Sequence, residues 1–157
     1  MRLRFLLHVH SNGRVGRALV HLRSLNRCRM VANRMSLTVT LPWPDRRLFP
    51  NARVFWAVKA KQVRIHRRLA YFEALKIQEA IPAEVRADED RSIYYRIIYV
   101  PKINRHRDED GIIASCKSYL DGVSDAIGIN DQRFHIRGVE ALPAKKPGSI
   151  TLEFWWE

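Results

Sequence analysis

The chain has 157 residues, 46% of them hydrophobic, and its 28 Lys and Arg against 16 Asp and Glu give a formal net charge of +12. This length fits one domain with its own core, and the apolar content argues against disorder for most of the chain. The charge favours nucleic acid as a partner ahead of an anionic membrane surface, and because no apolar run approaches the roughly 20 residues of a membrane span, we expect no membrane partner.

Residues 1–34 hold eight arginines and no acidic residue, so two thirds of the net charge lies there. Three interpretations compete: a basic arm that grips phosphate, a transit-like peptide, or an extension upstream of the true start. We favour the last, with Met35 as the functional start, because a strand pattern begins directly after it. The expected domains are therefore a basic N-terminal extension, 1–34, and one folded domain, 35–157.

The first half of the expected domain reads as a strand followed by a long helix. Ser36 to Leu41 alternates polar and apolar residues, and the Pro42–Asp45 segment ends the strand. Residues 54–79 are expected to form a helix that ends before Pro82, with 83–91 as a charged loop. Its expected buried stripe is Val58, Ile65, Leu69 and Phe72, and a basic strip of Lys61, Arg64 and Arg68 lies beside it.

The second half adds strands on either side of another helix. Ser92–Val100 is rich in β-branched and aromatic residues and predicts a central strand, followed by a basic loop, 102–107. Asp110 is the expected N-cap of a helix that ends at Gly128. Its expected buried stripe is Ile113, Cys116, Leu120, Val123 and Ile127, and two strands follow at 134–139 and 150–156. The fold class is therefore α/β (α+β), with a small mixed sheet of about four strands packed against two main helices.

The acidic cluster of Asp108, Glu109 and Asp110 stands out in so basic a chain. Carboxylates this close need a counter-ion, and Mg²⁺ takes one or two carboxylates plus substrate phosphate. If the chain is extended into Asp110, then Asp108 and Asp110 point the same way and can share an ion. Asp131 follows a helix about 25 Å long, so only the chain's return path or a partner subunit could bring it near. The alternative is that the first two acids complement the helix dipole and that Asp131 is a turn residue.

Basic side chains supply the remaining candidates. Lys117, two turns into the helix, leans toward its acidic end and could offset charge that develops on a phosphate, although a surface pair with Asp121 is the simpler interpretation. Phosphate contacts are expected from Lys61, Arg64, Arg68, Arg105 and Arg107, with a solvated helix face as the alternative for the first three.

The two cysteines, Cys28 and Cys116, are far apart in the sequence. They form neither a disulfide framework nor a closely spaced zinc-ligand pair. We therefore expect a reducing, cytoplasmic location.

The order of LTVTLPWP, a basic helix, a strand, Asp108-x-Asp110, a helix with Lys117-x-x-x-Asp121-Gly and then Asn130-Asp131 resembles the RusA-like Holliday-junction resolvases. The resemblance covers about residues 36–157. It implies a RusA-like fold and a homodimer that nicks four-way DNA junctions in pairs with Mg²⁺, in the cytoplasm of a bacterial or phage-infected cell. By position, Asp108, Asp110 and Asp131 match the family's metal-site acids and Lys117 its essential lysine. Where the family usually has Asn after the second Asp, this chain has Gly111.

The residues and the resemblance together predict a metal-dependent endodeoxyribonuclease that resolves Holliday junctions and other branched DNA in recombination and repair. Asp108, Asp110 and Asp131 would hold Mg²⁺, which Mn²⁺ could replace, and Lys117 would stabilise the transition state. The rival hypothesis is a basic module that binds branched or single-stranded phage DNA without cutting it.

Overall fold

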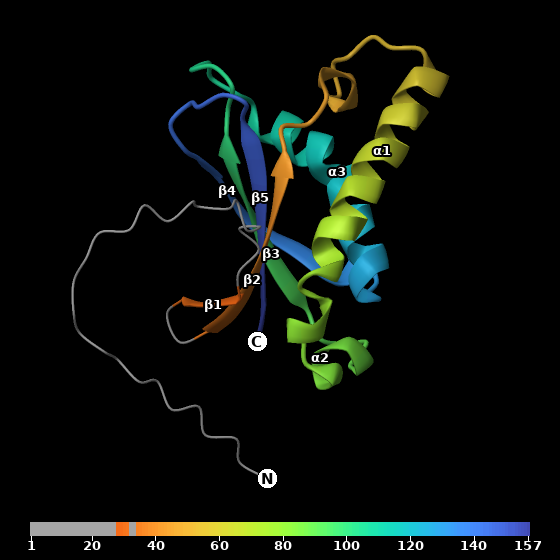
Figure 1. Ribbon diagram of the computed structural model, residues 1–157, viewed down its shortest axis with the longest axis vertical. Coiled ribbons are helices and arrows are strands. Elements are labelled where there is room, and N and C mark those ends of the chain that lie inside the picture. The colour runs from red at the N-terminus through yellow and green to blue at the C-terminus, as the bar shows by residue number, and fades with distance from the viewer. Residues whose placement is uncertain (1–27, 32–33) are drawn as a thin grey trace, which may run out of the picture.

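The structure is a computed structural model that describes residues 28–31 and 34–157 (Figure 1). The chain forms five strands, three α-helices and three short 3-10 helices in the described residues. They are β1 (Cys28–Val31), β2 (Arg34–Pro42), η1 (Arg46–Leu48), α1 (Trp56–Leu75), η2 (Gln78–Ala80), α2 (Ala83–Ala87), β3 (Ile93–Val100), α3 (Glu109–Ile127), η3 (Asp131–Arg133), β4 (Phe134–Ala141) and β5 (Ser149–Trp156).

One mixed sheet of five strands in the order β1-β2-β5-β3-β4 forms the centre of the fold. The pair β3–β4 is parallel, with α3 as the connection between them, and the other neighbouring pairs are antiparallel. Both long helices, α1 and α3, lie on the same side of the sheet (Figure 1). The predicted class, a small mixed sheet with two main helices, is confirmed.

The sheet has one strand more than the four expected. The additional strand, β1, lies in the segment predicted as a basic extension and pairs with β2 in the register Cys28↔Leu37 to Val31↔Arg34. The sheet therefore begins before Met35. The rest of the predicted extension, residues 1–27 and 32–33, lies outside the described residues.

The core forms between the sheet and the two helices. The helix-facing side chains of β2, β3 and β5 are buried, and α3 adds a broad buried surface. Of the stripe predicted on α3, Cys116, Val123 and Ile127 are fully buried, while Ile113 and Leu120 are half-buried against the core. Because α3 contacts α1 as well as the sheet, its buried surface is wider than one stripe and includes Ile112, Ser115 and Tyr119.

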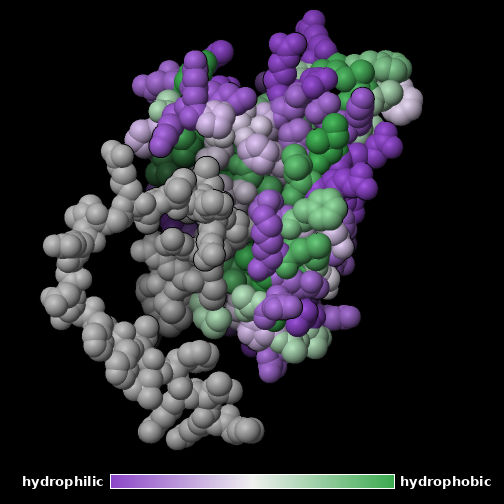
Figure 2. All heavy atoms as spheres, viewed as in Figure 1, coloured by the Kyte–Doolittle hydropathy of each residue, from purple (hydrophilic) through white to green (hydrophobic). Residues whose placement is uncertain are grey.

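The face predicted to be buried on α1 is wrong. The residues that α1 buries are Gln62, His66, Ala70 and Ala74, and the stripe of Val58, Ile65, Leu69 and Phe72 is exposed. The reason is steric, because α1 lies so close to α3 that only small side chains fit at the crossing. In Figure 2, green apolar atoms lie among purple hydrophilic ones on the side where α1 is seen.

Helix boundaries differ from expectation at three places. Helix α1 covers Trp56–Leu75, where a helix over 54–79 was expected. Residues 83–91, predicted as a loop, begin with the short helix α2, which Pro82 precedes and whose Val85 is buried. Proline is favoured at the start of a helix, because the first amide groups of a helix have no hydrogen-bond acceptor within it and a missing N–H costs nothing there. Helix α3 begins at Glu109, one residue before the predicted N-cap Asp110, and ends as predicted at Gly128 with φ of 69°. Within the described residues, no helix combines the length and apolarity that crossing a membrane requires.

Candidate functional site

The predicted acidic cluster lies where the basic loop meets the start of α3. Asp108 is the N-cap residue in an extended conformation, while Glu109 and Asp110 fall in the first helical turn. The expected alternation of Asp108 and Asp110 along an extended chain is therefore wrong. Both residues nevertheless line one cleft.

This acidic cleft has a volume of about 700 Å³ and lies between the 101–110 segment and the end of β4. The acidic residues Asp108, Glu109 and Asp110 line it together with Arg105 and Arg107. A helix start favours negative charge nearby, because its first amide groups carry partial positive charge. The cleft thus brings carboxylate oxygens and guanidinium groups to the same space.

A second, basic cleft of about 1330 Å³ adjoins it. One wall is the segment 42–54, which contributes Arg46, Arg47 and Arg53, and the other is the loop that carries Lys102. The three arginines of the first wall were missed by the sequence analysis. The Arg46–Arg47 pair directly after the PWPD segment could have indicated them, since a strand end and a turn hold the pair in place.

The two clefts share one wall, formed by Arg105, His106, Arg107 and Asp108. The guanidinium carbon of Arg107 lies 5.4 Å from the ring centroid of Trp43, a cation–π contact. Its Nε atom is buried and has no hydrogen-bond partner among the described residues. The Arg107 guanidinium group therefore lies over an aromatic ring, with its Nε shielded from solvent.

Hydrogen bonds hold the wall opposite the loop in place. The backbone amide and the guanidinium group of Arg47 donate to the Asp45 carboxylate at 2.8–2.9 Å, which keeps the pKa of Asp45 far below its usual range. The Asp45 amide donates to Nε2 of the buried His66 at 3.2 Å. Because the carbonyl oxygen of Gln62 can only accept, Nδ1 of His66 donates to it at 2.9 Å. Helix α1 thereby anchors the wall that carries the missed arginines.

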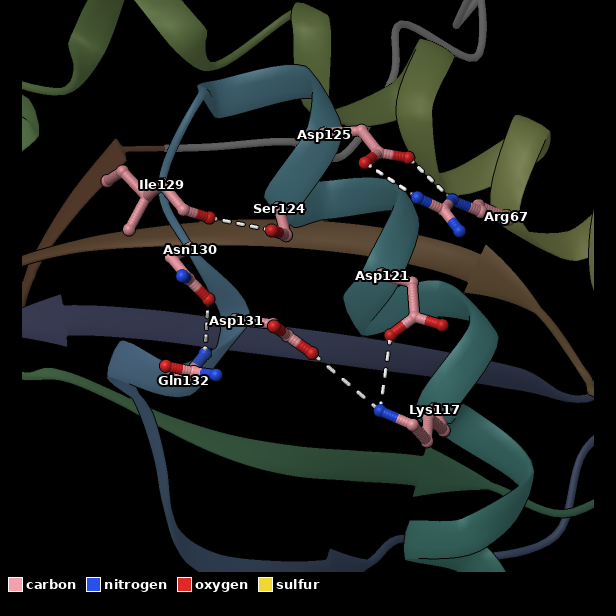
Figure 3. A network of polar contacts seen from close by, with 9 residues as sticks. All are labelled: Arg67, Lys117, Asp121, Ser124, Asp125, Ile129, Asn130, Asp131 and Gln132. Atoms are coloured by element: carbon pink, nitrogen blue, oxygen red, sulfur yellow. Dashed lines mark hydrogen bonds and ion pairs between the residues drawn. The ribbon is translucent and has the colours of Figure 1, made fainter.

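The lysine of the predicted site, on α3, and its third aspartate, in η3, lie close together (Figure 3). The chain turns back at Gly128, and the Asn130 side chain accepts the Gln132 amide at 3.0 Å, which starts η3. This return places the Asp131 carboxylate 3.7 Å from Nζ of Lys117. The same Nζ atom donates a hydrogen bond to Asp121 at 3.4 Å. The return path thus brings Asp131 to Lys117 but not to Asp108 and Asp110.

The three predicted metal ligands do not gather within one subunit. Across the residues that the structure describes, no group of three His, Cys, Asp or Glu side chains could hold a metal ion. Lys117 follows Asp110 by seven residues, a rise of about 10 Å along the helix. Asp108 and Asp110 lie at the acidic cleft, and Asp131 pairs with Lys117 two turns further on.

The basic strip predicted to contact DNA, Lys61, Arg64 and Arg68, is exposed on the outer side of α1 and lines neither cleft. Its neighbour Arg67 belongs to a different arrangement. It donates two hydrogen bonds to Asp125 of α3, at 2.6 and 2.8 Å, and thereby lowers the pKa of that carboxyl group (Figure 3). Of the predicted phosphate-binding residues, only Arg105 and Arg107 line the clefts.

Comparison with known proteins adds one sequence relative and remote structural likenesses. No family model matches the chain. Thiamine monophosphate kinase from Aquifex aeolicus shares 11% identity over 78% of this chain, at a TM-score of 0.32, and tt0281 from Thermus thermophilus shares 11% over 81%, at 0.30. The chain spans about a third of the length of these two proteins (33% and 34%), and scores this low support no conclusion about fold or function.

The sequence relative comes from Xylella fastidiosa (strain Temecula1) and is described as an uncharacterized protein. It is 36% identical over 110 residues, which cover 68% of this chain and 68% of the relative. Identity at this level over two thirds of both chains places them in one family. The chain belongs to the same family as this Xylella fastidiosa protein.

Proposed function

We propose that the protein is a Mg²⁺-dependent endodeoxyribonuclease that cuts Holliday junctions and other branched DNA in recombination and repair. The observation that carries the proposal is the wall shared by the two clefts, where Asp108 stands beside Arg105 and Arg107. A phosphodiester chain in the basic cleft would pass these cations and reach the carboxylates of the acidic cleft. A cation-lined cleft of this kind concentrates and orients a polyanion.

Asp108 and Asp110 are the residues that would hold the ion. Mg²⁺ uses one or two protein carboxylates and fills its other positions with water and substrate phosphate, so two acids lining one cleft fit its needs. When bound, the ion would polarise the phosphate and generate the attacking hydroxide, and Mn²⁺ could replace it. Arg107, whose guanidinium group lies over the Trp43 ring in the wall shared by both clefts, would bind and orient a phosphate oxygen through its terminal nitrogens.

Within one subunit, Asp131 forms an ion pair with Lys117 and does not lie with Asp108 and Asp110. Asp131 and Asp121 flank the Lys117 ammonium group, so Asp131 is a positioning residue for the lysine in this arrangement. The resemblance assigns Asp131 to the metal, and that role would require Lys117 to move or a second subunit to contribute. A homodimer in the cytoplasm remains part of the proposal.

The test is cleavage of a synthetic four-way junction with Mg²⁺, by wild type and by Asp110→Asn and Asp108→Asn. Wild type should give nicked product that disappears in excess EDTA, and both variants should lose activity. Asp90→Asn, in the exposed turn before β3, is the matched control and should cut as wild type does. Equal cutting by Asp110→Asn or in EDTA would refute the proposed mechanism.

One observation favours a second candidate, a basic module that binds branched or single-stranded DNA without cutting it. The described residues contain no three-ligand metal group within one subunit. This module would show salt-sensitive binding that survives Asp110→Asn, and no product at any metal concentration.

A further inference from the structure

Phe55 and Trp56, at the start of α1, form an exposed aromatic pair. Their side chains are 67% and 74% exposed, the largest fractions among the exposed large hydrophobic residues of the described chain. The two ring centroids are 5.7 Å apart, with the ring planes tilted by 48°. Two large rings kept in water cost free energy unless a ligand covers them.

The pair directly follows the wall of the basic cleft. Arg53 and Val54 line that cleft, and the next two residues are Phe55 and Trp56. In Figure 1, the start of α1 lies at the same end of the molecule as the end of β2 and the loop between β3 and α3. A polyanion bound in the cleft and leaving past Arg53 would therefore meet the rings.

The charge around the pair limits what can cover it. From Arg46 to Phe72 the chain carries eight Lys and Arg residues and no Asp or Glu. A second copy of this face would bring like charges together, which costs several kcal/mol in a protein interface. The ligand that fits combines negative charge with flat apolar faces, as nucleic acid does.

We propose that Phe55 and Trp56 form a stacking site for unpaired bases of a nucleic acid whose backbone lies in the basic cleft. This site rests on the proposed function, since it needs the cleft to bind DNA, and it adds a preference for substrate shape. In a duplex each base face is covered by its neighbours, so free faces occur at single-stranded segments and at branch points. Stacking of one base on an aromatic side chain contributes about 1–3 kcal/mol.

The experiment compares binding of a fluorescent oligothymidylate and of a duplex of equal length by anisotropy at one salt concentration. Trp56→Ala and Phe55→Ala should each weaken oligothymidylate binding by about 5- to 150-fold, the factor that 1–3 kcal/mol gives. Duplex binding should change less than about twofold, because the cleft arginines remain. Trp56→Phe should recover most of the affinity, which separates loss of a ring from loss of the fold.

Phe72→Ala is the matched control. Phe72 is an exposed aromatic residue (54%) on the same helix, 16 residues after Trp56, or about 24 Å along the axis. Its removal should leave binding of both oligonucleotides unchanged. In addition, oligothymidylate should quench tryptophan fluorescence in wild type and quench it much less in Trp56→Ala.

The outcomes separate the two proposals. If wild type binds neither oligonucleotide, the DNA-binding function fails and the stacking site with it. If wild type binds both and the alanine variants bind equally well, the stacking site is wrong and the function stands. If Trp56→Ala instead alters the sedimentation coefficient or the binding to phosphatidylserine vesicles, with DNA binding intact, the pair serves self-association or a lipid surface and the proposal is overturned.

Discussion

Gly122 of α3 lies so close to α1 that a methyl group in its place would overlap the backbone carbonyl oxygen of Arg67. The same methyl group would lie 2.9 Å from the Cβ atom of Ala70, closer than side chains approach. The two helices that position the clefts are therefore in near backbone contact, and any larger residue at this crossing must force them apart.

We expect Gly122→Ala to lower the free energy of unfolding by about 3 kcal/mol, at the upper end of typical overpacking costs. The gain of about 1 kcal/mol that Ala brings to a helix interior does not offset a backbone overlap. Urea unfolding measures the change. Gly138→Ala is the control, since a methyl group there has nothing within 4 Å, and it should not lower stability, because Ala is favoured over Gly inside a strand by about 0.5–1 kcal/mol.

The Asp45 carboxyl group predicts how the stability of the protein depends on pH. Its carboxylate is hydrogen-bonded by Arg47, so its folded pKa is depressed below the unfolded value of about 3.9. Its stabilising contribution is then present above about pH 4 and is lost as the pH falls toward the folded pKa. Asp45→Asn should lower stability at neutral pH by about 1 kcal/mol and flatten the acid limb of the stability curve. An acid limb as steep as that of wild type would contradict this assignment.

Cys116 should be chemically inert in the folded protein. Burial raises the pKa of its thiol to about 12, so almost no thiolate forms at pH 8. Native protein treated with iodoacetamide should show no label on the Cys116 peptide by mass spectrometry, and protein unfolded in urea should be fully labelled. Rapid native labelling at this residue would mean that the core opens locally.

The two basic surfaces should contribute unequally to DNA binding. Arg53 lines the basic cleft, whereas Arg64 lies on the outer side of α1. We expect Arg53→Ala to weaken duplex binding and to reduce the slope of log K against log salt by about 1, as loss of one phosphate contact does. Arg64→Ala should change the slope less. The reverse order would favour the exposed strip of Lys61, Arg64 and Arg68 as the DNA track.

Lys117 should matter for cleavage and hardly for stability. Its side chain is 72% exposed, and exposed ion pairs contribute about 0–1 kcal/mol. Lys117→Met should leave urea unfolding within about 0.5 kcal/mol of wild type. Junction cleavage should fall by about 100-fold or more, the usual cost of removing a group that stabilises transition-state charge. Lys76→Met removes a comparable exposed pair, with Glu73 on α1, and should leave cleavage unchanged.

The sequence located the elements well but misread the orientation of α1. Alternation in Ser36–Leu41 and the apolar run at 92–100 predicted β2 and β3, and Gly128 ends α3 in the left-handed conformation as expected. Hydrophobic periodicity finds the face with the largest apolar side chains, and on α1 that face is exposed. Because α1 crosses α3 at near contact, Ala70 and Ala74 face inward, and no pattern of large residues could reveal this.

The candidate site was predicted only in part, for a similar reason. Asp108 and Asp110 are neighbours in sequence, so their shared cleft could be anticipated. The pairing of Asp131 with Lys117 depends on the turn after Gly128, whose direction periodicity does not encode. The arginines of the basic cleft lie opposite the loop that carries Arg105 and Arg107 because β2 and β3 end on the same side of the molecule. The two strands do so because both pair antiparallel with β5, which lies between them.

The position of β5 bears on how the protein is made in the cell. This strand, the last of the five in sequence, lies between β2 and β3 and pairs with both. Until residues 149–156 have left the ribosome, the nascent chain has two unpaired strand edges and no continuous sheet, and such edges invite aggregation. The sheet therefore cannot be completed before residues 149–156 are available, and a stop codon just before residue 149 would yield a target for chaperones and proteases instead of a shortened working protein.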